Sequence, residues 1–309
     1  MKMMTKIGLV TLLLFAVAVS LYAVQSPKTD AAVTEKIAND YGVHALPMPT
    51  YLEFAGEPVP LENPDIMERM DRELHVNTYW QSNMIILMKR ANKHFPRIEA
   101  LLAEHNLPDD FKYLAVAESS LDNVRSPAGA AGFWQFLKGT AKEYNLEVND
   151  YVDERYNIDL ATEMAAKYLN KSKDRFGTWT LACAAYNAGN AGVNRQLERQ
   201  DVKDYYDVLL NSETSRYVFR ILAFKEIMSN PKKYGFNLRP TDLYQEIPIK
   251  KVVVNYAVED FAKWSKDQGI NYKILKIHNP WLRDTFLKNT SKKEYIIEIP
   301  EEGYYQLNK

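Results

Sequence analysis

Apolar residues recur at helical spacing in several segments of the chain between residues 64 and 188. One such stripe begins at a proline followed by two acidic residues, which are signals of a helix start, and continues through Phe111, Leu114 and Ala115 to Glu118. A carboxylate in register with an apolar stripe is partly withdrawn from water, which disfavours its charged form and raises its pKa. The pattern therefore predicts a helix whose last turn presents an acid suited to proton transfer near neutral pH. The alternative is a glutamate whose long stem reaches open water.

Further helical patterns flank this stretch on both sides. Apolar spacing predicts helices within residues 64–104, which we interpret as an N-terminal extension that packs on the central helices. Helices are also predicted after Thr140, over residues 158–169 and over residues 179–188, the last of which ends at a glycine suited to a left-handed cap. The expected fold class is therefore mainly α.

The pattern changes beyond Pro240. A β-rich run at Val252–Val254 is followed by two short helical patterns and then by a second strand candidate at Tyr295–Ile299. This order predicts a small α/β module over residues 240–309.

The first 24 residues have the pattern of an export signal. Lys2 and Lys6 precede an apolar core, and Ala18 with Ser20 supplies a small-x-small cleavage candidate. The alternative is an uncleaved anchor, because residues 7–24 are just long enough to span a bilayer. Both outcomes place the body of the protein in the periplasm or cell envelope, and the second adds membrane association through residues 7–24.

Composition and charge narrow the classes of function. The 309 residues include 39 basic and 40 acidic side chains, a net charge of −1, and no polybasic cluster, so no nucleic-acid partner is expected. The glycines at positions 129 and 132 lack the Lys-Ser/Thr pair of a phosphate-binding loop, and the five histidines show no ligand spacing. We therefore predict no nucleotide, no metal and no cofactor. The single cysteine, Cys183, is expected to be a small buried hydrophobe.

Three motifs follow the predicted acid in order. Residues 126–135 have the pattern S-x-x-G-A-x-G-x-x-Q, in which the glycines permit a tight turn and Trp134 offers a ring face beside the amide of Gln135. Later come Ala-Tyr-Asn-Ala-Gly at residues 185–189 and Glu-Thr-Ser-Arg-Tyr-Val at residues 213–218. Together these matches resemble the lytic transglycosylases of the soluble-lytic-transglycosylase type (glycoside hydrolase family 23). The tryptophan before the glutamine is similar in particular to their membrane-bound murein transglycosylase D group.

The resemblance implies a domain organisation. A lysozyme-like helical catalytic domain is expected over residues 96–235, after a linker and helical extension over residues 25–95, in which five prolines favour a linker up to residue 60. The module over residues 240–309 is similar to a degenerate LysM peptidoglycan-binding module that lacks the Gly-Asp-Thr turn of that family around residues 256–259. Its alternative is a βααβ cap that only stabilises the body.

The resemblance also implies a reaction on peptidoglycan glycan strands with a single carboxyl group. Glu118 would protonate the oxygen between N-acetylmuramic acid and N-acetylglucosamine, and would then accept the proton of the muramyl C6 hydroxyl, which gives a 1,6-anhydro product without water. Asp122, one turn on, would be the second carboxylate if the enzyme were a hydrolase, although its place at a helix end favours a turn residue. Two alternative functions stay open: a hydrolytic muramidase similar to goose-type lysozymes, and a non-catalytic peptidoglycan-binding scaffold.

The substrate-binding residues that the resemblance implies are Ser119, Ser126, Gln135, Tyr186, Asn187 and Tyr217. In this view Ser119 orients the acid, Gln135 contacts sugar or N-acetyl groups, and the two tyrosines line the cleft near the acid. Two departures from the family pattern stand out: a shorter spacing, which predicts a reshaped loop between Glu118 and Ser126, and a missing basic group, which argues against any salt bridge that this group makes in the family. Seven residues separate Ser126 from Glu118, one fewer than the family spacing, and Arg155 stands alone where the family carries two basic residues.

Overall fold

The computed structural model describes residues 44–305. The expected export signal or anchor over residues 1–24, and the part of the expected linker up to residue 43, lie outside the described residues. The chain from Leu46 onward forms one compact unit. No helix within residues 44–305 combines the length and the hydropathy that a membrane span needs.

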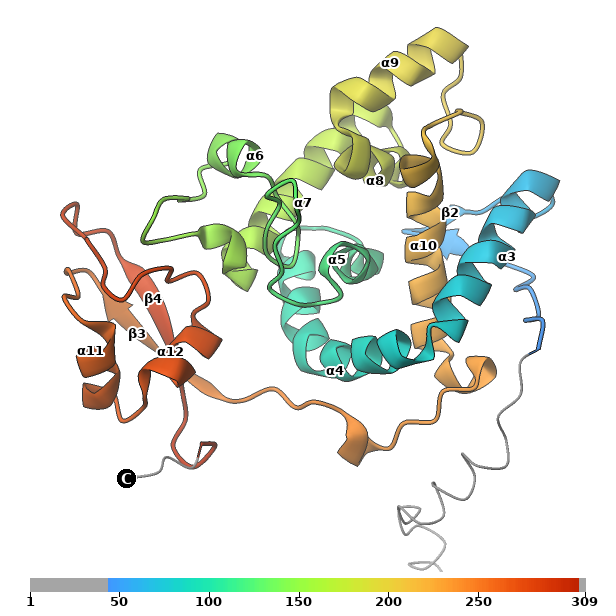
Figure 1. Cartoon of the computed structure of the whole chain (residues 1–309). Coiled ribbons are helices and arrows are strands. Elements are labelled where there is room, and N and C mark those ends of the chain that lie inside the picture. Colours follow the sequence, from blue (N-terminus) through green and yellow to red (C-terminus); the bar gives the residue numbers. More distant parts are fainter. Residues whose placement is uncertain (1–43, 306–309) are drawn as a thin grey trace, which may run out of the picture. The chain divides into compact units, whose positions relative to one another are not determined.

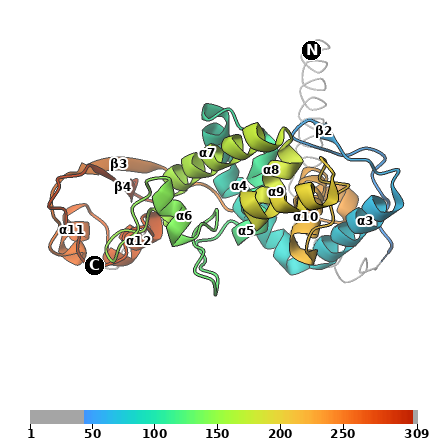
Figure 2. The ribbon, with the colours of Figure 1, turned by 90° about the horizontal axis from the view of Figure 1, so that it is seen from above.

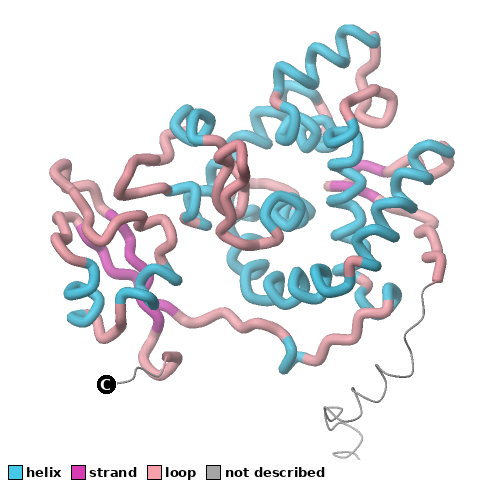
Figure 3. The backbone as a smooth tube through the Cα atoms, viewed as in Figure 1, coloured by secondary structure: helices cyan, strands magenta, loops and turns pink. Residues whose placement is uncertain are grey.

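The structure is mainly helical, as the sequence predicts, and Figure 3 shows the strands confined to an N-terminal hairpin and to the C-terminal module. The strands and α-helices are β1 (Glu53–Phe54), β2 (Glu57–Pro58), α3 (Pro64–Tyr79), α4 (Gln81–Glu104), α5 (Lys112–Ser119), α6 (Lys138–Glu143), α7 (Ile158–Phe176), α8 (Trp179–Ala188), α9 (Asn190–Gln200), α10 (Ser212–Ser229), β3 (Ile249–Val254), α11 (Phe261–Asp267), α12 (Tyr272–His278) and β4 (Tyr295–Pro300). Short 3₁₀ turns lie at Asp109–Phe111, Glu154–Tyr156, Pro231–Tyr234 and Pro240–Asp242.

Helix α5 is the centre of the helical domain. It packs against α4 and α10 (Figure 1), and its buried residues share one hydrophobic core with those of α7 and α8. Leu114 and Ala115 are fully buried and Val116 is 1% exposed, so the helix is covered on every face along these turns. A helix that is apolar all round belongs in a core, which explains why so short an element is stable here. Its last turn, which carries Glu118, is thereby held on a rigid support.

The N-terminal extension packs on the helical domain through α3. Figures 1 and 2 both show α3 beside α10, and an ion pair joins the two helices, with Arg216 Nε 2.7 Å from Glu73 Oε1. Glu73 is 1% exposed, and Asn77 Nδ2 also donates to its backbone oxygen. A buried carboxylate is tolerated only when it is paired in this way. The helices predicted within residues 64–104 are thus present as α3 and α4.

The predicted linker up to residue 60 is wrong for its last part. Residues 53–58 form the β1–β2 hairpin, and Phe54 is fully buried with its ring 5.2 Å from that of Phe111. Glu57 accepts hydrogen bonds from the backbone nitrogens of Trp179 (2.6 Å) and Thr180 (2.9 Å). These amides begin α8, so a carboxylate there also complements the helix dipole. The hairpin is therefore part of the helical core and caps the helix that carries Tyr186.

The C-terminal module has the predicted strand, helix, helix, strand order, with strands longer than predicted. β3 and β4 pair antiparallel with Val252 opposite Ile297. The fully buried Ile297 and Ile299 of β4 pack into a second hydrophobic core, separate from that of the helical domain. Ion pairs join the module to the helical domain, one of them between Lys293 and Glu154 (2.7 Å).

Candidate active site

Glu118 lies in the last turn of α5, and its carboxyl group is partly exposed at the edge of the core. Tyr217, from α10, donates a hydrogen bond from its hydroxyl to Glu118 Oε1. The register of Glu118 with the apolar stripe is therefore as the sequence predicts, and its long stem does not carry the carboxyl group into open water.

Burial raises the pKa of Glu118 to about 7. The hydrogen bond from Tyr217 and the positive charge of Arg220 act in the opposite direction, and the negative charge of Glu213 adds to the rise. Desolvation thus outweighs the groups that favour the carboxylate. At neutral pH the protonated and ionised forms are both well populated, which is what a group that gives and then takes back a proton requires.

A fully buried phenol, Tyr217, and a partly buried one, Tyr186, lie near this carboxyl group. Tyr217 is fully buried, and burial raises the pKa of its hydroxyl well above the ordinary value. Tyr186, on α8, donates its hydroxyl to the backbone oxygen of Trp134 at 2.6 Å, and burial raises its pKa in the same way. Both tyrosines therefore stay protonated and donate hydrogen bonds at physiological pH. The predicted placement of both near the acid agrees with the structure.

Asn187 follows Tyr186 at the end of α8. Its Oδ1 accepts a hydrogen bond from Thr214 Oγ1 at 2.8 Å, and Thr214 belongs to the first turn of α10, which Asn211 caps. The motifs at residues 185–189 and 213–218 are thus joined directly by side chains. This contact fixes the end of α8 relative to the start of α10.

Three other predicted residues are tied to nearby backbone. Ser119 Oγ donates to the oxygen of Ala115 (3.2 Å), so it closes its own helix and does not bond to the acid. Ser126 Oγ accepts from the nitrogen of Ala130 at 3.1 Å. Gln135, which adopts a positive φ of 50°, donates from Nε2 to the oxygen of Gly132 at 2.7 Å. The amide nitrogen of Gln135 therefore shapes the loop, and it neither faces open solvent nor stands free.

The expectation that Trp134 offers a ring face beside the amide of Gln135 is wrong. Its side chain is fully buried, and its Nε1 donates to Thr162 Oγ1 of α7 at 2.8 Å. An indole whose faces are packed and whose polar atom is satisfied inside the core stabilises the fold. It anchors the loop of residues 126–136 on α7.

Sequence reasoning missed the arginine that holds the loop after Glu118. Ser120 and Leu121 both have positive φ (56° and 53°), which is costly for residues with a side chain. Arg90, on α4, donates to the oxygen of Ser120 (3.0 Å) and to Asp122 Oδ2 (2.6 Å). Asp122 also accepts from the nitrogen of Asn123, so it is a turn residue paired with a cation. No spacing near Glu118 signals Arg90, which comes from a different helix.

A second arginine holds the glycine loop. Arg155 is 5% exposed, pairs with Asp153 at 2.7 Å and donates to the backbone oxygens of Gly129 and Phe136, each at 2.9 Å. A Cβ atom on Gly132 (φ +77°) would stand 1.8 Å from the oxygen of Arg155, so this position requires glycine. The lone arginine of the loop at residues 151–157 therefore holds the loop of residues 126–136 in place.

Two segments of the chain match families of known proteins. Residues 96–209 match the family described as transglycosylase SLT domain, and residues 250–303 match the soluble lytic transglycosylase C-terminal LysM-like domain. Residues 96–209 are therefore similar to an SLT transglycosylase domain, and residues 250–303 are similar to a LysM-like module.

A particular relative is the membrane-bound lytic murein transglycosylase D of Escherichia coli (strain K12). It is 28% identical over 252 residues, which are 80% of this chain and 54% of the relative. The chain thus spans about half the length of the curated relatives it matches. Among solved structures, an inactive mutant of the lytic transglycosylase Slt from Pseudomonas aeruginosa is 22% identical, covers 50% of this chain and 26% of that chain, and gives a TM-score of 0.38. The 70 kDa soluble lytic transglycosylase of Escherichia coli is also 22% identical, covers 48% of this chain and 26% of that chain, and gives a TM-score of 0.36.

Proposed function

We propose that this protein is a peptidoglycan lytic transglycosylase. It cleaves the β-1,4 bond between N-acetylmuramic acid and N-acetylglucosamine without water and leaves 1,6-anhydro-muramyl ends. The SLT domain match supports the reaction class. The observation that carries the mechanism is the carboxyl group of Glu118, which burial holds at a pKa of about 7 beside a protonated phenol.

Glu118 acts first as an acid and then as a base. Its proton goes to the glycosidic oxygen, the bond from that oxygen to the muramyl C1 breaks, and the N-acetylglucosamine leaves with a new hydroxyl group. The substrate's own N-acetyl carbonyl stabilises the anomeric centre. The ionised Glu118 then takes the proton of the muramyl C6 hydroxyl, whose oxygen closes on C1, so the enzyme ends the cycle protonated. Tyr217 stabilises the carboxylate stage by donating its hydrogen bond.

Water is not needed as a nucleophile in this scheme, and neither is a second carboxyl group. A hydrolase would use Asp122 as nucleophile or base, but Asp122 is ion-paired with Arg90 at 2.6 Å. Its pairing favours an anchoring role.

The remaining predicted residues are assigned to the substrate. We assign Tyr186 and Asn187 to contacts with sugar or N-acetyl groups near the acid. Gln135 would contact the same groups through its Oε1, because its Nε2 already donates to the loop backbone. Ser119 and Ser126 support α5 and the loop. The LysM-like module binds the same glycan strands. Because peptidoglycan lies outside the cytoplasm, the protein works in the periplasm or cell envelope.

Product analysis tests this proposal directly. Purified sacculi digested by the protein are expected to release muropeptides with 1,6-anhydro ends, identified by mass spectrometry. Reducing muramyl ends would show a hydrolytic muramidase, and binding to sacculi without any release would show a scaffold. Either result overturns the proposal.

A further inference from the structure

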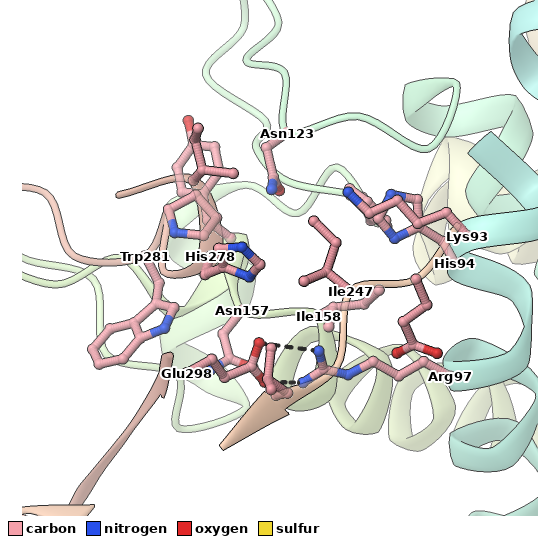
Figure 4. Close-up of a pocket in the computed structure, with 16 residues that line it drawn as sticks. Lys93, His94, Arg97, Asn123, Asn157, Ile158, Ile247, His278, Trp281 and Glu298 are labelled. Carbon is pink, nitrogen blue, oxygen red and sulfur yellow. Dashed lines mark hydrogen bonds and ion pairs between the residues drawn. The ribbon is translucent and has the colours of Figure 1, made fainter. Parts of the chain in front are cut away.

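A pocket of about 120 Å³ lies away from Glu118, between the helical domain and the C-terminal module. Figure 4 shows Lys93 and His94 of α4 on one wall and His278 and Trp281 of the module on the opposite wall. Asn123 closes one end, in the loop that follows Glu118.

At the end of the pocket formed by Arg97, the charged side chains are already paired with one another. Arg97 donates from Nε to Asp159 (2.6 Å) and from both terminal nitrogens to Glu298 of β4, the pair marked by dashed lines in Figure 4. These bonds join α4 to the module across the pocket and pair the charge of Arg97 with two carboxylates. The end formed by Arg97 and Glu298 is therefore a rigid wall.

Four other polar groups of the pocket, Lys93, His94, Asn123 and Glu246, are different, because no described residue donates to or accepts from their side chains, whereas Asn157 and His278 do have such partners. Lys93 is only partly exposed and has no ion pair within residues 44–305. Burial, with the charge of Lys93 second, lowers the pKa of His94 to about 3, so this imidazole is neutral and offers one donor and one acceptor. Asn123 and the exposed Glu246 complete this unpaired set. An unpaired cation, an amide and an unpaired anion around one pocket match a ligand that carries both charges.

Size and apolar lining narrow the class further. A water-sized group needs about 10–15 Å³ of such space, so the pocket accommodates roughly 8–12 non-hydrogen atoms, the size of a dipeptide and less than an N-acetyl sugar. Ile158, Ile247 and Phe133 line its middle and suit short alkyl side chains. We propose that this pocket binds a short peptide with a free carboxylate and a free ammonium group. Lys93 and Asn123 hold the carboxylate, and Glu246 holds the ammonium.

Titration of the full chain with alanyl-alanine, in its L,L and D,D forms, tests the pocket by NMR. Binding of either form is expected to shift the Asn123 side-chain amide and the Trp281 indole in a saturable way. Lys93→Met is expected to weaken binding at least about fivefold, because a charge-assisted hydrogen bond is lost. The matched control is Lys89→Met, one turn earlier on α4, whose ammonium lies 5.3 Å from the Tyr244 ring and outside the pocket. Absent shifts, or equal losses in the two variants, overturn the proposal.

A second arm tests the ammonium end. N-acetyl-alanyl-alanine lacks the positive charge and is expected to bind the unchanged protein several-fold more weakly than alanyl-alanine. Glu246→Gln is expected to weaken alanyl-alanine by a similar factor and to leave the acetylated probe unaffected. Equal weakening of both probes by this variant would contradict the assignment of Glu246.

The source of the peptide is distinguished by kinetics, and this arm alone rests on the proposed function. If the pocket takes the peptide stems of glycan strands, Lys93→Met raises KM on stem-bearing strands and leaves turnover of strands stripped of stems unchanged. If the pocket takes a free peptide, Lys93→Met loses dipeptide binding and keeps the same KM and kcat on both kinds of strand. Equal loss of kcat on both strands overturns the proposal, since it would indicate damage to the catalytic site. The NMR titration stands even if the protein turns over no glycan.

Discussion

Two carboxyl groups four residues apart in the sequence have opposite surroundings. Glu118 closes helix α5, is partly buried, and accepts its hydrogen bond from the neutral hydroxyl of Tyr217. Asp122 lies in the loop beyond, with 49% of its side chain exposed, and pairs with the guanidinium of Arg90. Burial raises the pKa of Glu118 to about 7 even beside a hydrogen-bond donor, whereas Asp122 lies half exposed in an ion pair. The burial of Glu118 and the exposed ion pair of Asp122, more than the spacing in the sequence, therefore separate the acid from the anchor.

Removing each carboxyl group in turn gives the largest expected contrast. Glu118→Gln should lower the release of soluble muropeptides from sacculi by roughly 10²–10⁴-fold, the usual contribution of a general acid and base. Asp122→Asn should lower it less than about tenfold, because only the loop is loosened. A turbidity assay on sacculi measures both. Comparable losses in the two variants would end the distinction between acid and anchor.

Removing the neutral donor sharpens the comparison. Tyr217→Phe deletes the hydrogen bond that stabilises the Glu118 carboxylate, so turnover should fall roughly 10–100-fold. The same bond lowers the pKa of Glu118, so the pKa should rise and the alkaline limb of the kcat/KM profile should move to higher pH. An unmoved limb together with reduced turnover would indicate that Tyr217 acts only on the substrate.

The buried acid also predicts a cost in stability. Its pKa is raised in the folded state from 4.5 to about 7, so between these pH values the folded protein holds a proton that the unfolded chain has released. The contribution of Glu118 to the free energy of unfolding therefore falls as pH rises through this window. At pH 8 the free energy of unfolding of Glu118→Gln, measured by denaturant titration, should exceed that of the unchanged protein by roughly 1–3 kcal/mol. At pH 4 the two proteins should be equally stable. A variant less stable at pH 8 would contradict this.

The charge of Arg220 should have a smaller effect than the phenol. Its guanidinium lies 5.5 Å from the Tyr217 ring and lowers the pKa of Glu118, and its buried Nε has no hydrogen-bond partner within the described residues. Arg220→Met should move the alkaline limb of the kcat/KM profile to higher pH by less than about one unit. Arg220→Lys, which keeps the charge, serves as the control and should leave the limb close to its original place.

The anchor itself should give the smallest change. Arg90→Ala removes a partly exposed pair and the support of Ser120, and should lower the free energy of unfolding by about 1 kcal/mol. Thermal unfolding measures this loss. A several-fold larger loss would show that the two left-handed residues after Glu118 depend on Arg90 more than surface pairing allows.

The local parts of this picture could be predicted from the sequence. Helix α5, the register of Glu118 and the order of elements in the C-terminal module follow from periodicity, which is a property of neighbouring residues. The pairing of Glu118 with Tyr217 spans 99 positions, and only the resemblance to a family suggested it. Arg90 and Arg155 gave no signal, because an arginine that bonds to backbone oxygens of another loop leaves no periodic pattern.

Two errors have identifiable physical causes. The prolines up to residue 60 suggested a linker, but the turn at Ala55 and Gly56, both with positive φ, folds residues 53–58 into a hairpin whose Glu57 caps α8. Trp134 beside an amide suggested an available ring face, but its indole is buried and donates to Thr162. In both cases tertiary packing decided between two conformations that the local sequence allowed.

The most direct measurement is the titration of the Glu118 carboxyl group itself, followed by ¹³C NMR of the protein labelled at glutamate side chains and assigned with Glu118→Gln. The account predicts a resonance that titrates near pH 7, moves to higher pH in Tyr217→Phe, and is missing from the glutamine variant. A Glu118 resonance that titrates near 4.5, as an ordinary exposed glutamate does, would contradict the account.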